Sequence, residues 1–445
     1  MKLLYKILFV AAAGWALTSC DKYLDVKPKG LVIPERLADY EGILNSPTMT
    51  RTFPLNLLDF TDDYFNNIDV LAQSPAANGY YWRPIITVNE KASPDVWGPL
   101  YRVIYDANVI INGVPATPEA NTELANSVIG EALVIRANCY LELLTVFARS
   151  YHPATAANTP GLPLVTSINV TDKTPARSTL KATVDTLIAN INRAIPLLPT
   201  SNTNKSRVTK YVAWGLLSRI YLYMGDFENA EKYTDLALDA PHAMLDYNAY
   251  ATYSAVPRYE QSSEVLWHRA AVSGSPLFMI YSDDLKAHFN DDDIRYTFLT
   301  TTNNNGLGRS SLPGTYNFGI TFPELYLTKA ELLARKNQYD DAMDIVNMIR
   351  QNRIKTAAYA DQTAGSGEEA LALVLAERRR ELAFSGLRWF DMKRLDREGR
   401  MPEVKRINPD TQEVYATLAP GSANYTFEIP VRVQLFNPGM ELNHQ

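Results

Sequence analysis

The sequence has only two cysteines in 445 residues, Cys20 and Cys139. A disulfide framework needs several paired cysteines, so we expect none here. Cys139 lies in the apolar stretch Arg136–Leu144, which predicts a buried helix residue, because free cysteine behaves as a small hydrophobic side chain. Cys20 follows an apolar run at the N-terminus and has a different explanation.

The sequence also has few histidines and no recognisable catalytic motif. The five histidines are scattered, with none at metal-ligand spacing, and no nucleophile elbow, phosphate loop or zinc signature is present. We therefore expect no catalytic, cofactor or metal site. The run Asp291–Asp293 could bind calcium, but it lacks the spacing and distal glutamate of an EF-hand loop. Helix capping and an Asp293–Arg295 contact are the favoured interpretation. A carboxylate pair for glycoside hydrolysis is not excluded, because its spacing exists only in three dimensions.

The charge balance lacks the basic excess of a nucleic-acid-binding protein. Lys and Arg total 43 against 49 Asp and Glu, a net charge of −6, whereas nucleic-acid binders usually present a basic face.

Tyrosine is the abundant aromatic residue, with 26 copies against 15 Phe and 6 Trp. Its flat apolar ring and polar tip suit both helix packing and a wet binding surface.

Residues 1–19 have the features of a secretory signal. A basic start precedes the apolar run Ile7–Leu17, which is too short for a good membrane span. The sequence Leu17-Thr-Ser-Cys20 resembles a lipobox, which predicts that Cys20 becomes the lipid-modified first residue of the mature chain. The alternative is a plain signal peptide with an incidental cysteine.

Apolar residues at helical spacing predict that most of the chain is helical. The pattern gives helices over Trp97–Gly113, Ser127–Tyr151 and Leu180–Leu198. The clearest repeat signal is Ala213–Leu238, which predicts two antiparallel helices around a Gly-Asp turn. Its residues at tetratricopeptide positions are Trp214, Leu217, Tyr221, Gly225, Ala230 and Ala237.

A second, weaker repeat lies at Tyr326–Ala342, and 127–151 with 180–198 could be another, split by a long insertion. Because one repeat cannot bury its own faces, several should stack into a superhelix. The irregular segment Asp246–Leu312 contains a predicted strand at Glu264–His268, and Tyr425–Val433 is predicted to be another. The expected fold is mainly α: a tetratricopeptide-like helical superhelix with irregular loop insertions and a few short strands.

Four segments, in order along the chain, resemble the SusD/RagB family of bacterial outer-membrane lipoproteins. They are Ser19–Asp25, Glu131–Arg136, Glu377–Arg394, and Ile429-Pro430 followed by Asn437–Asn443. The resemblance implies a lipoprotein signal peptide at 1–19 and a SusD-like helical region with tetratricopeptide-type repeats at 20–245. It implies a SusD/RagB region with a ligand-binding insertion at 246–445.

The resemblance also implies a function. Such a protein is a non-enzymatic lipoprotein of the outer membrane that binds a nutrient, most often an oligosaccharide or glycan, and needs no cofactor. Its expected partner is a TonB-dependent transporter barrel of the SusC/RagA type, over which it acts as a lid. Cys20 would anchor it, facing outside. A peptide ligand is the first alternative, because some family members take peptides. A lipid-anchored glycoside hydrolase and a tetratricopeptide adaptor are the others.

The candidate ligand-binding residues follow from the chemistry of sugars. Sugar rings present apolar C–H faces, which flat aromatic rings commonly meet while polar side chains fix the hydroxyls. The candidates are Tyr80, Tyr81, Trp82 and Arg83, with Tyr281 and Tyr316 from the irregular insertion, and Asp63 and Asn66 as hydrogen-bonding groups. The alternatives are that the aromatic cluster fills the core, since tryptophan is usually mostly buried, and that Asp63 caps a helix.

The run Glu377–Arg394 places carboxylates beside arginines. On a helix, Glu377 and Glu381 share a face with Arg380, and Arg388 is within reach. This spacing predicts mutual ion pairs and a structural clamp, not a catalytic site. Gly386 fits a helix end that needs a positive φ.

Overall fold

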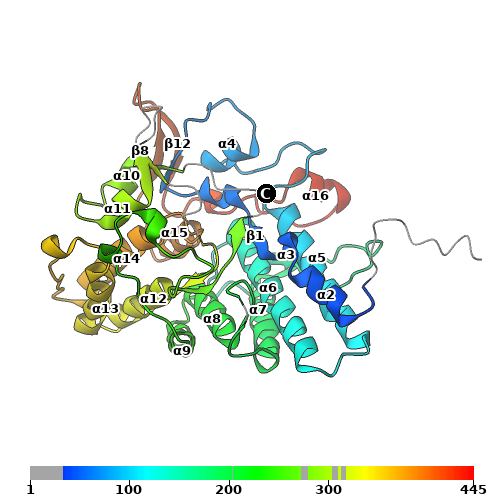
Figure 1. The fold of residues 1–445 in the computed structure, drawn as a ribbon. Coiled ribbons are helices and arrows are strands. Elements are labelled where there is room, and N and C mark those ends of the chain that lie inside the picture. The colour runs from blue at the N-terminus through cyan, green and yellow to red at the C-terminus, as the bar shows by residue number, and fades with distance from the viewer. Residues whose placement is uncertain (1–33, 203, 272–278, 303–308, 312–316, 445) are drawn as a thin grey trace, which may run out of the picture. The chain divides into compact units, whose positions relative to one another are not determined.

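The computed structural model describes residues 34–202, 204–271, 279–302, 309–311 and 317–444. The chain divides into two units, Met1–Glu35 and Arg36–Gln445. Of the first unit only residues 34 and 35 are described, and neither belongs to a helix or strand. The predicted signal peptide and Cys20 therefore lie outside the described residues. The second unit carries all the elements labelled in Figure 1, and the division expected at residue 245 stays a prediction.

The second unit is built mainly from helices, as the sequence predicts. The first half contains α2 (Leu37–Leu44), α3 (Pro47–Thr50), α4 (Pro75–Tyr80), α5 (Trp97–Gly113), α6 (Glu123–Phe147), α7 (Leu180–Ala194), α8 (Lys210–Met224) and α9 (Phe227–Leu238). The second half contains α10 (Asp283–Lys286), α11 (Ile294–Phe298), α12 (Phe322–Arg335), α13 (Tyr339–Gln351), α14 (Gly367–Glu381), α15 (Arg388–Arg397) and α16 (Val431–Phe436).

The long helices begin and end close to the predicted positions. The α5 boundaries match the prediction, and α6 lies four residues nearer the N-terminus because the Thr122 hydroxyl caps it by accepting from the Ala125 N–H. Helix α7 ends at Ala194 and continues as a 3-10 turn over Ile195–Leu197. Nearly every residue of α6 is buried, Cys139 included, so this helix forms the centre of the core.

The predicted repeat at 213–238 is the helix pair α8–α9. Gly225 adopts φ +79° after α8, and the Asp226 carboxylate then caps α9 by accepting from the Asn229 N–H. Ala230 is fully buried where the two helices meet. Helices α12 and α13 form the second predicted pair, and α9 packs against α12. The helices from α5 to α9 and on through α12 to α14 thus stack side by side, which confirms the predicted helical superhelix (Figure 1).

The strands are short, and some of them pair segments that are distant in the chain, whereas β11 and β12 form a local hairpin. The antiparallel pairs are β3 (Pro160–Pro163) with β4 (Arg177–Thr179), β5 (Val265–Trp267) with β10 (Ile320–Thr321), and β11 (Val404–Ile407) with β12 (Val414–Leu418). Strand β1 (Arg51–Phe53) runs parallel to β6 (Ala270–Ala271). The largest sheet has the order β2 (Tyr64–Phe65), β7 (Ile280–Tyr281), β9 (Arg309–Ser311) and β8 (Thr300–Thr302). Strand β5 confirms the strand predicted at 264–268.

The strand predicted at Tyr425–Val433 is wrong. Residues 423–425 form a 3-10 turn and α16 begins at Val431, with an extended stretch between them. That stretch is buried throughout. Its Phe427 N–H donates to the carbonyl of Val146 in the last turn of α6 (2.9 Å), and its Glu428 N–H donates to the Pro84 carbonyl in a loop (2.7 Å). Its apolar residues fill the core without a neighbouring strand, which a local pattern cannot distinguish from a paired strand.

Candidate functional site

The aromatic run Tyr80–Trp82 lies where α4 ends. The Ser74 hydroxyl caps this short helix by accepting from the Ala77 N–H, and Pro75 occupies its first turn. The chain leaves the helix through Trp82, which has φ +49°. The Trp82 ring is 1% exposed, and its Nε1 donates to the Phe60 carbonyl at 2.8 Å. In this conformation the indole is a core side chain and presents no face to a ligand.

Arg406 of β11 packs against Tyr80 and Trp82 and holds the same run in place. Its guanidinium carbon lies 3.9 Å from the centroid of the Tyr80 ring and 4.4 Å from that of Trp82, which places the cation against both aromatic rings. It also donates to the backbone carbonyls of Tyr80 (2.9 Å) and Thr61 (2.8 Å). Arg406 is buried, so the β11–β12 hairpin is held against the end of α4.

A cavity of about 120 Å³ lies between α4 and this hairpin, and we call it the hairpin cavity. Its lining is Phe65, Asn66, Asn67, Ile68, Asp69, Val70, Tyr80, Tyr81, Arg406, Ile407, Asn408, Pro409 and Tyr415. Three of the predicted site residues therefore come together here: Asn66, Tyr80 and Tyr81. Sequence reasoning missed the hairpin residues, because nothing local to them indicates that they pack against residues more than 300 positions earlier.

The two tyrosines of the cavity are held by their hydroxyl groups. The Tyr80 hydroxyl accepts from the backbone N–H of Asn66 at 3.1 Å, and the Tyr81 hydroxyl donates to the Ile68 carbonyl at 2.5 Å. Burial raises the pKa of Tyr81, so its hydroxyl stays protonated at neutral pH. The Tyr415 ring meets Tyr81 edge to face, with 6.3 Å between centroids. The rings are thus fixed as apolar walls, and the amide side chains supply the polar part of the lining.

Arg83, the last residue of the predicted aromatic run, serves the loop before α4. It donates to the carbonyls of Val70 and Ala72 and, at 2.8 Å, to the Asn78 side chain. It does not line the hairpin cavity. Its guanidinium therefore holds the two ends of the 70–83 loop together and supports the cavity wall without facing the cavity.

Tyr281 and Asp63 lie outside the hairpin cavity. Tyr281 is buried in β7, opposite Tyr64, and its ring packs on Phe384 at 5.0 Å; it lines a second cavity of about 80 Å³. Asp63 is buried and caps no helix, because its carboxylate pairs with Arg379 at 2.7 Å. Burial raises the pKa of Asp63, and Arg379 only partly offsets that effect. Tyr316 lies outside the described residues.

Asp62, the neighbour of Asp63 in the sequence, binds Arg388 at 2.6 Å. Burial opposes ionisation of Asp62, but Arg388 and Arg379 outweigh burial and hold its pKa below the usual range. The expectation that Arg388 would pair with the glutamates of its own run is therefore wrong. Its partner lies 326 residues earlier in the chain, beyond the reach of any local spacing rule.

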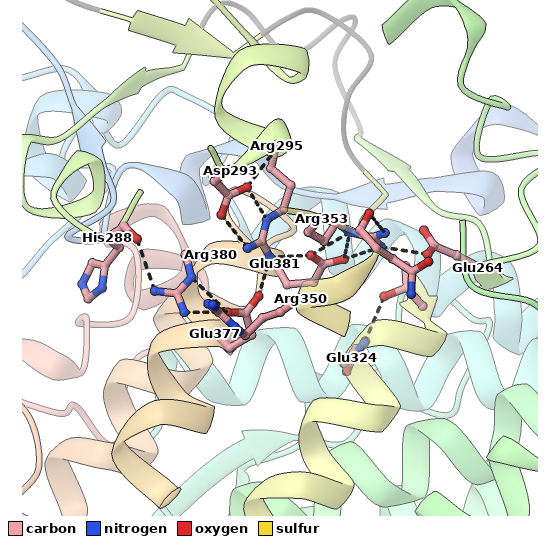
Figure 2. A network of polar contacts seen from close by, with 12 residues as sticks. Glu264, His288, Asp293, Arg295, Glu324, Arg350, Arg353, Glu377, Arg380 and Glu381 are labelled. Carbon is pink, nitrogen blue, oxygen red and sulfur yellow. Dashed lines mark hydrogen bonds and ion pairs between the residues drawn. The ribbon is translucent and has the colours of Figure 1, made fainter. Parts of the chain in front are cut away.

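The predicted ion pairs of Glu377 and Glu381 belong to a buried group that we call the arginine network (Figure 2). Arg295 lies at its centre, 2.6 Å from Asp293 and 2.7 Å from each of the two glutamates. The other members are Arg353, which binds Glu264 and Glu381, and Arg380, which binds Glu377. The predicted Asp293–Arg295 contact and the clamp of Glu377 on Arg380 are both confirmed.

The electrostatics of the arginine network suit a structural role. Burial alone would raise the pKa of Glu377, but Arg295 and Arg380 lower it to about 2. Arg353 and Arg295 likewise lower the pKa of Glu381 despite burial. Both carboxylates therefore stay ionised and paired, which is the opposite of what a general acid requires. Gly386, where the run turns, has the predicted positive φ of +87°.

In the part of the chain that the structure describes, no helix is long and apolar enough to cross a membrane. No cluster of three or more His, Cys, Asp and Glu side chains in that part has the arrangement of a metal site.

Comparison with known proteins gives two family matches. Residues 22–222 match a SusD-like family described as starch-binding and associating with the outer membrane, and residues 248–437 match the SusD family. The curated SusD-like protein P25 of Formosa agariphila is 24% identical over 274 residues. That alignment covers 56% of this chain but only 48% of the relative, so the chain matches about half of its length.

Solved structures share the fold along nearly the whole chain. A putative sugar-binding protein from Bacteroides vulgatus superposes with a TM-score of 0.74 at 22% identity, covering 93% of this chain and 99% of the other. Surface glycan-binding protein A from Bacteroides uniformis gives a TM-score of 0.69 at 15% identity, covering 91% and 99%. Two adjoining family matches and the same helical superhelix agree: the chain belongs to the SusD/RagB family.

Proposed function

We propose that this protein is a surface lipoprotein that binds an oligosaccharide without turning it over and passes it to a TonB-dependent transporter barrel. The observation that carries the binding step is the hairpin cavity, where Tyr81 and Tyr415 form apolar walls beside the amides of Asn66, Asn67 and Asn408. The comparisons support carbohydrate as the ligand class, because the family matched by residues 22–222 is described as starch-binding and structural neighbours are described as sugar-binding and glycan-binding.

The composition of this cavity suits a sugar better than a charged ligand. A sugar ring needs an apolar surface for its C–H face and neutral donors and acceptors for its hydroxyls. Tyr81 and Tyr415 supply the surface, and the amides of Asn66 and Asn67 supply both hydrogen-bonding roles. The Asn408 amide is engaged within the hairpin, where it donates to the Tyr415 hydroxyl and accepts from the backbone N–H of Asp410. The one arginine of the lining, Arg406, donates to backbone carbonyls and lies against Tyr80 and Trp82, so it is engaged in holding the fold.

Anchoring and delivery extend the proposal to the membrane. We infer that Cys20 carries the lipid, because it follows an apolar signal and a lipobox-like sequence, and that the transporter is of the SusC/RagA type. The outer-membrane association of the matched family supports this location.

The binding test replaces Asn66 with Ala and titrates purified protein with neutral oligosaccharides by calorimetry. Asn66 bonds to the Tyr80 hydroxyl through its backbone N–H and not through its side chain, so Asn66→Ala should leave the melting temperature unchanged. Losing one hydrogen bond of about 1 kcal/mol should weaken binding roughly fivefold. Asn158→Ala, an exposed asparagine away from the cavity lining, is the matched control. Equal affinities for the two variants and the wild type would remove the hairpin cavity from the proposal.

A peptide ligand has one specific observation in its favour. Three large apolar side chains are exposed on the segments that line the hairpin cavity, namely Leu71 at 79%, Val414 at 47% and Ile407 at 41%. Such side chains could cover apolar residues of an extended peptide. Parallel titrations with neutral oligosaccharides and with mixed tripeptides to hexapeptides separate the two. Binding of peptides alone would replace the sugar in the proposal.

The hydrolase alternative needs a carboxyl with a raised pKa beside a second carboxylate. Burial raises the pKa of Glu142 to about 7, but this side chain lines a separate cavity of about 30 Å³, which holds a few waters and no sugar ring. Burial also raises the pKa of Asp59 to about 7 and raises that of Glu264, but neither lines the hairpin cavity. Glu264 and its neighbour Glu381 line the cavity of about 80 Å³, where both are paired with Arg353. We therefore expect an oligosaccharide to be recovered intact after prolonged incubation with the protein, as chromatography can check.

A further inference from the structure

A larger cavity lies away from the hairpin, between the start of α5, the loop after β3, and α16. Its volume is about 330 Å³, against about 120 Å³ for the hairpin cavity. Pockets that hold a drug-sized ligand commonly measure roughly 300–1,000 Å³, and one sugar ring needs less space than such a ligand. The α5–α16 cavity, as we call it, therefore has room for one or two sugar rings. No residue of the proposed hairpin site lines it.

The floor of the α5–α16 cavity is aromatic and rigid. The Trp97 and Tyr101 rings pack at 4.9 Å between centroids on successive turns of α5. The Tyr101 hydroxyl donates to the Pro163 carbonyl at 2.8 Å, which ties the helix to the end of β3. On the opposite wall Phe436 is 74% exposed, an unusual position for so large an apolar side chain. Apolar rings thus face the space from two elements more than 300 residues apart.

The polar contribution comes mainly from Arg432, on the same wall as Phe436. Its guanidinium donates to the Lys91 carbonyl at 2.8 Å and lies 5.6 Å from the centroid of the Phe436 ring. Among the described residues, Arg432 has no carboxylate within 4.0 Å. The acid nearest in sequence to the α5 side of the cavity, Asp95, accepts from the Thr87 hydroxyl instead and is not part of the lining. An arginine that borders an apolar cavity without an anionic partner has donors available for one.

We propose that the α5–α16 cavity is a second binding site, for a sugar residue that carries a carboxylate, such as a uronic acid. The C–H face of the ring would rest on the aromatic floor, and the carboxylate would accept a forked pair of hydrogen bonds from Arg432. A neutral sugar fits the floor equally but leaves the guanidinium without its anion. This inference rests on the proposed function in taking the ligand to be a glycan, and it adds both a second site and an acidic specificity.

The test compares an acidic and a neutral ligand of the same size on detergent-purified full chain. Trigalacturonate and galactotriose are titrated by calorimetry into the wild type, Arg432→Gln and Arg102→Gln. Arg432→Gln should weaken trigalacturonate binding roughly tenfold or more, the usual effect of losing a charge-assisted contact, and should leave galactotriose binding unchanged. Arg102 is an exposed arginine of α5 that does not line the cavity, so Arg102→Gln controls for the lost charge.

Two further measurements locate the ligand. Adding Asn66→Ala should leave the effect of Arg432→Gln on trigalacturonate undiminished, because the sites are separate. The wild-type affinity for trigalacturonate should fall as NaCl rises, since the guanidinium is only half-buried. Trigalacturonate binding that is equal in the wild type and Arg432→Gln would overturn the second site while leaving the hairpin cavity intact. Absence of binding by acidic and neutral glycans alike would refute the proposed function together with this inference.

Discussion

Replacing Arg295 with Met should destabilise the fold strongly, because this guanidinium is the centre of the arginine network. Its side chain is 2% exposed, and those of its partners Asp293, Glu377 and Glu381 are 0–7% exposed. Removing one partner of a buried ion pair leaves uncompensated charge and typically costs about 3–5 kcal/mol. We expect the lower part of that range, since Arg380 and Arg353 still hold the glutamates.

The matched control is an ion pair of similar length at the surface. Lys329 binds Asp235 at 2.7 Å, with side chains 34% and 51% exposed. Exposed pairs contribute about 0–1 kcal/mol, so Lys329→Met should barely change stability. The assay is urea unfolding followed by circular dichroism, with free energies of unfolding extrapolated to water. A cost below about 1 kcal/mol for Arg295→Met, similar to that of the control, would refute the reasoning.

The same network should appear in the pH dependence of stability. The pKa of Glu377 is about 2 in the folded protein against an ordinary 4.5, a difference worth about 3 kcal/mol. Because the folded-state pKa is lowered, this stabilisation is complete above pH 4.5 and is lost as pH falls towards 2. Arg295→Met removes the cation with the larger effect on this pKa, so the variant should lose less stability than the wild type between pH 4.5 and 2. An unchanged loss of stability over this pH range would show that Arg380 alone sets this pKa.

Three other predictions address the scaffold, the anchor and the partner. Ala230→Trp should lower the free energy of unfolding by about 1–3 kcal/mol or more, because it overpacks the α8–α9 contact. Lys232→Trp, on the exposed face of α9, is the control and should leave stability unchanged. Equal melting temperatures for the two variants would count against the tight helix pair. Cys20→Ala should release the protein from membranes or leave it unprocessed, and an unmodified mature chain beginning elsewhere by mass spectrometry would disprove lipidation. The tagged protein should co-purify with a large β-barrel from mild detergent; recovery alone, under conditions that preserve other membrane complexes, would oppose the transporter partnership.

The helical scaffold could be predicted because its signals are local. The 3.6-residue period fixes α5, and a glycine followed by a capping aspartate at 225–226 fixes the turn between α8 and α9. Residues 425–433 show the limit of the same method. Their apolar pattern is compatible with a strand, yet whether a neighbouring strand exists depends on parts of the chain that a local pattern does not contain.

The candidate site could be predicted only in part, for a related reason. The run Tyr80–Trp82 is visibly aromatic, but its exposure depends on Arg406, which packs on Tyr80 and Trp82 from far along the chain. Tyr415 joins Tyr81 in the same way. The motif Asn408-Pro-Asp, between residues suited to strands, could have indicated a hairpin turn. It could not have indicated that the hairpin packs against α4.

The three consecutive arginines Arg378–Arg380 connect the scaffold to the candidate site. Successive residues of a helix point about 100° apart, so each faces a different neighbour. Arg378 binds Asp391 on α15 at 2.9 Å, Arg379 binds Asp63 at 2.7 Å, and Arg380 binds Glu377 at 2.5 Å. Asp63 immediately precedes β2, and the chain then reaches Asn66 in the hairpin cavity. The run that most specifically resembles the family therefore acts as a brace that holds Asp63 and the start of β2 against the helical superhelix. This role accounts for its many charges without assigning it any catalytic role.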